Sequence, residues 1–313
     1  MVDSATGQPI TDLQQHATDY LSGLYGPPAC MPEDKLEGSS PSAPSQDQPD
    51  IAWEVTLPGM NRALGRISAC TATGPDGIPA RLLKLLGPNS REQLAELFTT
   101  IINGGDIPED WRNGRVVLLL KPGGNAAHIG DYRALTVTSV VYRVFMQVLK
   151  AWISGWAESA HVLTELQNGF RPGRRLEDNL FVLTSCTEIA RKEGRRLICC
   201  FLDVEKAYDN VPHETLFHRL GTQGMAPPLL ETIKRLYREN VVTAVFGNVH
   251  SERVYVHRGL RQGCPLSPLL YLLYVAGLEK ALLQAKWDSA LSTAPQELTT
   301  PADCRVLPLL MIW

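Results

Sequence analysis

An aspartate at the end of an apolar run is the first residue whose surroundings suggest chemistry. Asp203 lies in FLDVEKAYDNV (201–211) and near the end of RRLICCFLDV (195–204), whose length and content predict a buried strand. Two-metal phosphoryl transfer needs carboxylates on a rigid edge that can hold Mg²⁺ ions. Tyr208 follows five residues later, placed to line a nearby pocket, and Asp209 comes next. Taken alone, an aspartate after an apolar strand is more often a strand-end or capping residue.

A second string, RGLRQGCPLSPLLYLLY (258–274), combines glycines with one amide side chain. Gly259 and Gly263 permit close approach of another backbone. Gln262 offers both hydrogen-bond donors and an acceptor, which suits a sugar or the edge of a base. The prolines and serine that follow fit the start of a helix. The plainer alternative is a glycine-containing turn before a capped core helix.

Together the two strings resemble motifs of reverse transcriptases from non-LTR (LINE-type) retrotransposons. FLDVEKAYDNV is similar to that family's first catalytic motif, and RGLRQGCPLSPLLY to its template- and nucleotide-positioning motif. Three further matches occur in the family's order: ATGPDGIPARLLK; VVLLLKPGG followed by DYRALTVTSVVYRVF; and QNGFRPGRRLEDNLF. The resemblance extends over residues 51–285.

The resemblance implies roles for individual residues. Asp203 and the backbone carbonyl of Val204 would bind Mg²⁺ (or Mn²⁺), and Tyr208 would be the steric gate against a ribose 2′-hydroxyl. Lys121 and Arg133 would contact the triphosphate of the incoming nucleotide, one as a compact cation and the other as a forked one. Outside this family context, these two cations would be read as solvated surface residues.

Two other groups complete the expected site. The resemblance implies that Gln262 and Gly263 line the nucleotide pocket. Arg171, Arg174 and Arg175 could grip template phosphates, each contact adding salt-dependent affinity. The alternative for the three arginines is an exposed basic loop without a partner.

The family's second catalytic motif, Ala-Asp-Asp, has no counterpart in the sequence. The 313 residues contain no Asp-Asp pair, and they finish with ADCRVLPLLMIW, where an apolar strand entering that motif is expected. We therefore expect a chain truncated before Ala-Asp-Asp, with the thumb also missing. Because one carboxylate cannot hold two Mg²⁺ ions, we further expect this chain to be catalytically inactive.

The elements that must position these residues can be read from periodicity and turn chemistry. We expect an amphipathic helix over 10–24 and a Ser/Pro-rich linker over 36–50. Strands are predicted at 115–121 and in a hairpin over 241–257 that turns at Gly247-Asn248. Helices are predicted from Pro79, over 90–103 (capped by Ser90 and ended by Gly104), 139–157, 177–193, 213–220 and 228–239, and from Leu266 to Leu283.

This interleaving predicts an α+β fold, and with the resemblance it implies a right-hand polymerase with fingers and a partial palm. The expected organisation is a helix plus linker over 1–50, the reverse transcriptase region over 51–285 and a truncated tail over 286–313. By resemblance to non-LTR proteins, residues 10–50 would correspond to the connector that follows an N-terminal endonuclease in many such elements.

Composition places limits on the class of protein. The net charge of −3 is unusual for a nucleic-acid enzyme, although lysines and arginines are locally clustered. Seven cysteines without Cys-x-x-Cys spacing argue against a disulfide framework or a zinc site. The sequence predicts neither a signal peptide nor a membrane span, so a nuclear or cytoplasmic location without a membrane partner is expected.

The expected function is RNA-directed DNA synthesis during retrotransposition, with an RNA template, a DNA primer and dNTPs as partners. Three alternatives are kept. The chain could be a non-catalytic RNA-binding module that uses the arginine loop, a fragment resembling the group II intron maturases, or a remnant without function. Oligomeric state is not indicated by the sequence.

Overall fold

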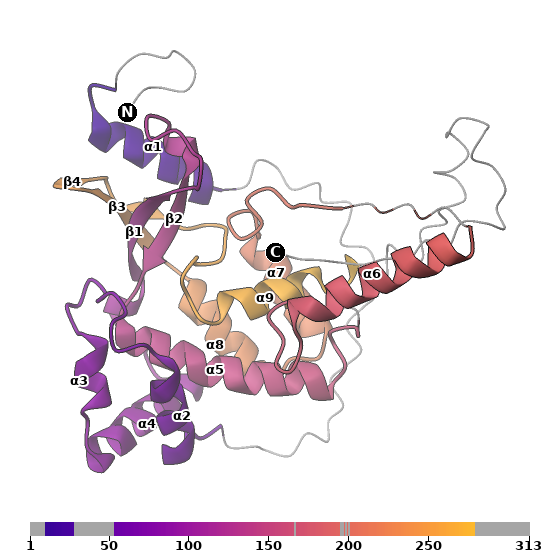
Figure 1. Cartoon of the computed structure of the whole chain (residues 1–313). Helices are drawn as coiled ribbons and strands as arrows, with labels where there is room; N and C mark the ends of the chain where they lie inside the picture. Colours follow the sequence, from indigo (N-terminus) through magenta and orange to yellow (C-terminus); the bar gives the residue numbers. More distant parts are fainter. Residues whose placement is uncertain are drawn as a thin grey trace. The chain divides into compact units, whose positions relative to one another are not determined.

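The computed structural model describes residues 10–27, 53–165, 167–194, 197, 199 and 201–278 (Figure 1). They divide between two compact units. The first comprises Met1–Ile153 and Lys206–Tyr271, and the second comprises Ser154–Glu205 and Leu272–Trp313. The predicted linker at 36–50 and tail at 286–313 lie outside the described residues, so the expected domain boundaries stay predictions.

A mixed β-sheet organises the first unit. Its strands are β1 (Asn113–Leu120), β2 (Tyr132–Val137), β3 (Val241–Phe246), β4 (Val249–His250) and β5 (Val254–Tyr255). The order is β2-β1-β3-β4, with β5 also paired to β3. β1 runs antiparallel to β2 and parallel to β3. A mixed sheet combined with segregated helices confirms the predicted α+β class.

The predicted hairpin turn is present in the sheet, and β1 also leads into a turn. β1 enters a turn in which Gly123 has φ +75°, as the Pro-Gly-Gly sequence indicates. In the hairpin, Val245 pairs with His250 and Phe246 with Val249, which leaves Gly247-Asn248 as the connecting residues. Gly247 has φ +55°, the left-handed backbone that a two-residue hairpin turn requires.

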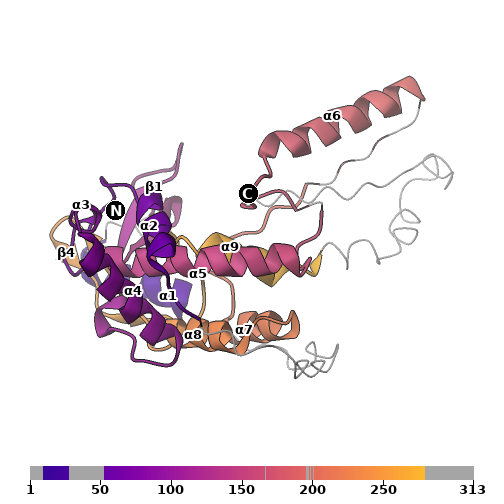
Figure 2. The same ribbon diagram turned by 90° about the horizontal axis from the view of Figure 1, so that it is seen from below.

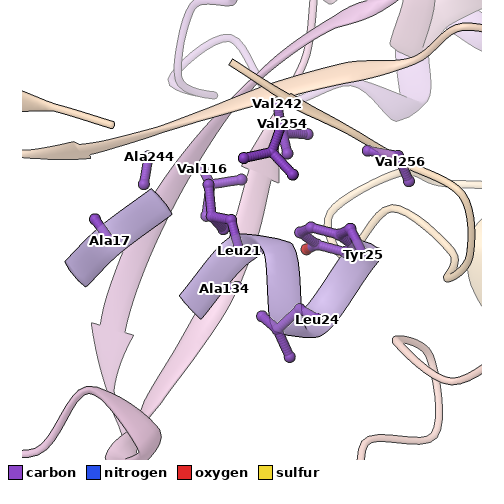
Figure 3. Packing of buried hydrophobic residues seen from close by; sticks show 10 residues of the cluster. All are labelled: Ala17, Leu21, Leu24, Tyr25, Val116, Ala134, Val242, Ala244, Val254 and Val256. Atoms are coloured by element: carbon purple, nitrogen blue, oxygen red, sulfur yellow. The ribbon is translucent and has the colours of Figure 1, made fainter. Parts of the chain in front are cut away.

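The N-terminal helix α1 (Leu13–Tyr25) covers one face of this sheet (Figure 3). Asp12 caps it by accepting a hydrogen bond from the Gln15 backbone nitrogen at 3.0 Å. Its buried side chains, including Leu21 and Tyr25, pack against apolar residues of the strands. The strand-side residues of this cluster are Val116, Ala134, Val242, Ala244, Val254 and Val256. The predicted amphipathic helix is therefore part of the core.

Further helices belong to the first unit. They are α2 (Leu57–Arg66), α3 (Ala80–Lys84), α4 (Pro88–Ile102), α5 (Val140–Ser159), α7 (His213–Thr222), α8 (Pro227–Tyr237) and α9 (Ser267–Val275), where α5 and α9 extend beyond the unit. The rings of Phe98, Trp111, Tyr142 and Phe145 meet at centroid distances of 4.9–6.0 Å. Figure 2 shows α4 and α7 beside α8, and both helices contact α8.

The predicted cap of α4 was wrong. Its N-cap is Gly87 and its first residue is Pro88, so the helix begins before Ser90. Proline is favoured at this first position because its fixed φ suits a helix and its missing N–H would have no partner there. At the other end, Asn103 is the C-cap and Gly104 follows with φ +104°, as expected of a residue that ends a helix.

The predicted strand over 195–204 is also wrong in its described residues. Residues 197, 199 and 201–204 have no regular secondary structure, and Phe201 and Leu202 are 70% and 55% exposed. A strand is stabilised by ladder hydrogen bonds to a neighbour. None of the strands among the described residues pairs with this segment. Residues 195, 196, 198 and 200 lie outside the described part.

The second unit contains the predicted helix at 177–193, observed as α6 (Leu176–Lys192). Glu177 and Asp178 occupy its first turn, and Arg191 and Lys192 its last turn, which complements the helix dipole. Across the described residues, every helix is too short or too polar to cross a bilayer.

Candidate functional site

The loop of residues 258–263, which follows β5, is joined to the segment before α7 by backbone hydrogen bonds. Gly259 N donates to Val211 O, and Leu260 N donates to Tyr208 O, each at 2.8 Å. This pairing brings together the two sequence motifs that carried the functional prediction, although they are far apart in the chain. The distance in sequence is bridged by α7, α8 and the hairpin.

Both glycines of the loop are required by close backbone approach. A Cβ on Gly259 would lie 3.0 Å from the carbonyl oxygen of Asp209, and the residue has φ +93°. A Cβ on Gly263 would lie 3.0 Å from the carbonyl oxygen of Thr136 in β2, with φ +102°. Thr136 N also donates to Gln262 O at 2.8 Å. The predicted close approach at these glycines is confirmed.

Asp209 and Gln262 face one another within this junction. Gln262 Nε2 lies 3.2 Å from each carboxylate oxygen of Asp209. Asp209 is only 6% exposed. Burial raises the pKa of its carboxyl, while the Gln262 hydrogen bond and the charges of Lys206, Arg258 and Lys121 act in the opposite direction.

Asp209 was not predicted as a site residue. The sequence signal that could have identified it is its position in FLDVEKAYDNV, an acid between Tyr208 and an apolar Val211. An acidic residue in such a setting has to be paired or hydrogen-bonded if it is buried. That it is buried, and that its partner is Gln262, follows only from the tertiary contacts.

Two further side chains hold the same junction. The ring of Tyr208 packs on that of Tyr271, with centroids 5.2 Å apart, and burial raises the pKa of the Tyr208 hydroxyl. His213 Nε2 lies 2.9 Å from Gly259 O and must be its protonated nitrogen, since a carbonyl only accepts. Burial lowers the pKa of His213, which favours this neutral imidazole.

The two predicted triphosphate contacts lie on neighbouring strands or their ends. Lys121 follows β1 and is exposed, with Nζ donating to Gly130 O at 3.0 Å. Arg133 is exposed on β2 and pairs in register with Leu119. Lys121 is close enough to Asp209 for its charge to influence that carboxyl. Both cations remain accessible to an anionic ligand.

The predicted metal ligands are located in the second unit. Asp203 and Val204 are both exposed. Within the described residues, no three His, Cys, Asp or Glu side chains gather into a group suited to a metal ion. A carboxylate and a backbone carbonyl are hard oxygen donors of the kind Mg²⁺ prefers. Two oxygen donors are, however, too few to form a site for two metal ions.

Arg171 makes internal contacts. Its Nε and Nη2 donate to the Glu158 carboxylate at 2.9 and 2.6 Å, and its Nη1 donates to the carbonyls of Gln167, at 2.9 Å, and Thr164. The guanidinium is the first cause of the lowered pKa of Glu158. A side chain bound in this way anchors its loop and has little capacity left for a phosphate.

The other two loop arginines differ from Arg171. Arg174 pairs with Glu165, and its side chain is about one-third exposed. Arg175 is exposed, and its backbone nitrogen donates to Asp178 at 2.9 Å, which orders the start of α6. Of the three predicted phosphate contacts, Arg175 is the most accessible.

A cavity of about 560 Å³ lies elsewhere in the first unit. Charged side chains on its wall include Arg112 and Glu239, which form an ion pair at 2.7 Å. None of the predicted site residues lines it. The candidate site therefore rests on the junction between the two motifs and not on this cavity.

Comparison with known proteins identifies the class. Residues 119–297 match the reverse transcriptase (RNA-dependent DNA polymerase) family. The chain belongs to this family, and the resemblance to retrotransposon reverse transcriptases that its motifs indicated is confirmed.

Its relatives are proteins of mobile elements. The chain is 26% identical over 86% of its length to a Xenopus laevis transposon TX1 149 kDa protein, of which it covers 21%. It is 22% identical over 72% of its length to the RNA-directed DNA polymerase from the Drosophila funebris mobile element jockey, covering 24%. It is 28% identical over 68% of its length to a Nasonia vitripennis Pol polyprotein from retrotransposable element R2, covering 20%. The chain thus spans about a quarter or less of these relatives.

Proposed function

We propose that this chain carries the nucleotide-binding side of a retrotransposon reverse transcriptase, the fingers and part of the palm. The parent activity would be DNA synthesis on an RNA template from a DNA primer. The observation that carries the proposal is the junction in which the 258–263 loop pairs with Tyr208 and Val211. It joins two motifs whose family roles concern the same incoming nucleotide.

Each predicted residue has a chemical part in this proposal. Lys121 and Arg133 would bind the triphosphate, since both are exposed cations, one directly after β1 and the other on β2. Tyr208 would exclude a ribose 2′-hydroxyl with a ring that Tyr271 supports. Gln262 would hydrogen-bond the nucleotide, and Gly263 would let it approach the backbone.

Asp203 and the Val204 carbonyl would supply part of a site for Mg²⁺ (or Mn²⁺). In this class of reaction, the metal ions stabilise the attacking and leaving oxygens. The sequence has no Asp-Asp pair, so the remaining carboxylates are not among these 313 residues. We therefore propose that the 313-residue polypeptide binds nucleotide and template–primer but does not extend the primer.

Equilibrium binding tests the nucleotide site. Purified chain should bind dATP in the presence of Mg²⁺ and a template–primer with a templating uridine, and it should discriminate against ATP. Tyr208→Ala should narrow that discrimination by weakening the steric exclusion of the 2′-hydroxyl. Equal affinity of the unmodified chain for dATP and ATP would contradict the assigned gate, and no affinity for either would contradict the site.

Primer extension tests the proposed inactivity. We expect no template-dependent incorporation by the 313-residue polypeptide. Incorporation that is abolished by Asp203→Ala would overturn this part of the proposal, because it would show a working metal site in the chain. The matched control is Asp106→Asn, which removes an exposed carboxylate remote from the expected metal ligands in sequence.

We also propose that RNA contact through the arginine loop is secondary to nucleotide binding. This is supported by the internal ion pair of Arg171, which leaves Arg175 as the most accessible of the three arginines.

An intracellular location, nuclear or cytoplasmic, fits the free thiols of Cys70, Cys186, Cys199 and Cys264.

A further inference from the structure

The buried contact between Asp209 and Gln262 determines which end of the glutamine amide is available. Gln262 Nε2 lies 3.2 Å from both Oδ1 and Oδ2, so the nitrogen is directed at the carboxylate. An ionised carboxylate only accepts hydrogen bonds, and an amide oxygen likewise cannot donate one, so only the amide nitrogen can bond to the carboxylate. The opposite orientation would place Gln262 Oε1 against the carboxylate, which is repulsive.

The carboxylate is itself held in place from several sides. The backbone of Asp209 is in close contact with Gly259, where a Cβ would lie 3.0 Å from the Asp209 carbonyl oxygen. The flanking residues Tyr208 and Val211 accept backbone hydrogen bonds from the loop that carries Gln262. Burial raises the pKa of the Asp209 carboxyl, and the Gln262 hydrogen bond and the charges of Lys206, Arg258 and Lys121 act in the opposite direction. Asp209 is therefore a fixed acceptor and not a mobile surface acid.

We infer that Asp209 is a positioning residue for nucleotide binding, and that it holds the Gln262 amide so that Oε1 faces the nucleotide. This inference rests on the proposed function of the site and deepens it. Gln262 then offers an acceptor, which selects a hydroxyl or N–H donor of the incoming nucleotide. Asp209 acts through Gln262 and has no contact of its own with the nucleotide.

The isosteric change Asp209→Asn tests this inference. The asparagine amide could donate as well as accept, so the Gln262 amide would no longer be restricted to one orientation. Loss of the charge-assisted hydrogen bonding between the Gln262 amide and the Asp209 carboxylate should lower dATP affinity about tenfold. The matched control is Asp19→Asn, because Asp19 accepts from Gln15 Nε2 at 2.8 Å on the exposed face of α1. Its dATP affinity should equal that of the unmodified chain.

A double-mutant cycle separates positioning from general structure. If Asp209 acts through Gln262, Gln262→Ala should also weaken dATP binding, and adding Asp209→Asn to it should cause no further loss. Multiplicative losses in the double variant would overturn the inference. The side-chain amide NMR signal of Gln262, assigned by its absence in Gln262→Ala, should move in Asp209→Asn and stay unchanged in Asp19→Asn.

The outcomes distinguish this inference from the proposed function. If the unmodified chain binds dATP and Asp209→Asn binds it equally well, the inference fails while the proposed function stands. If the unmodified chain does not bind dATP, both fail. An unmoved Gln262 amide signal in Asp209→Asn would contradict the contact itself, whatever the affinity.

Discussion

The guanidinium of Arg258 donates from Nε to the carbonyl oxygen of Leu24, with 2.9 Å between the two atoms. Its Nη2 donates to Gly23 O at 2.7 Å, and the neighbouring His257 N donates to Tyr25 O at 2.8 Å. The last carbonyls of a helix lack partners within it, and a cation there also complements the helix dipole. The first residue of the 258–263 loop thus fastens α1 to the candidate site.

Removal of the Arg258 guanidinium should destabilise the first unit. We expect Arg258→Ala to lower the free energy of unfolding by about 2 kcal/mol, because it leaves two helix-end carbonyls without their charged donor. Urea unfolding followed by circular dichroism measures the change. Arg62→Ala, which removes an exposed arginine from α2, should change stability by less than about 0.5 kcal/mol. Equal effects of the two substitutions would refute the role of Arg258.

Substitution of Gly259 should be more costly than that of another positive-φ glycine. Gly259→Ala combines left-handed strain of roughly 1–2 kcal/mol with overlap on Asp209 that adds about 1–3 kcal/mol. Gly247→Ala carries only the strain, since a Cβ at that position would have no atom within 4 Å. Thermal unfolding of both variants measures the difference. A Gly259→Ala protein as stable as Gly247→Ala would show that the loop can separate from Asp209.

Asp209 should lower stability at neutral pH. Burial raises the pKa of its carboxyl above 3.8, so the folded chain holds that proton more tightly than the unfolded chain. Its contribution is therefore most favourable below pH 3.8 and is lost as pH rises through the folded pKa. We expect Asp209→Asn to be more stable than the unmodified chain at pH 7.

The pH dependence of unfolding checks this sign. The stability difference between Asp209→Asn and the unmodified chain should shrink as pH falls toward 3.8. A variant that is less stable at pH 7 would mean that contacts to the ionised carboxylate outweigh its burial. If Asp209→Asn is more stable at pH 7 and also binds dATP more weakly, then Asp209 serves function at a cost in stability.

Arg171 and Arg175 should have separable effects. Arg171→Ala removes the charged donor to Glu158 and two carbonyls, so it should lower the stability of the second unit by roughly 2–3 kcal/mol. Arg175→Ala should leave stability unchanged and reduce the salt dependence of RNA binding by about one charge. Hydrogen exchange measures the first effect and fluorescence anisotropy at several salt concentrations the second. The reverse pattern would restore Arg171 as the phosphate contact.

The sequence by itself determined the family and most of the helices and turns. Residues close in sequence carry this information: apolar periodicity places α1 and α5, Gly247-Asn248 specifies the hairpin, and FLDVEKAYDNV and RGLRQGCPLSPLLY identify the class. Such patterns depend on local geometry and on strings long enough to be specific. They predicted a close backbone approach at Gly259 and Gly263, but not which backbone would be approached.

Tertiary structure alone decided how the charged and polar side chains are used. The sequence patterns assigned no role to Asp209 and a phosphate contact to Arg171, whereas folding buries Asp209 beside Gln262 and pairs Arg171 with Glu158. It also decided that residues 201–204 are exposed, because a strand requires a neighbour and not only apolar content. Burial and pairing are relations between distant segments, so no local pattern in the sequence could specify them.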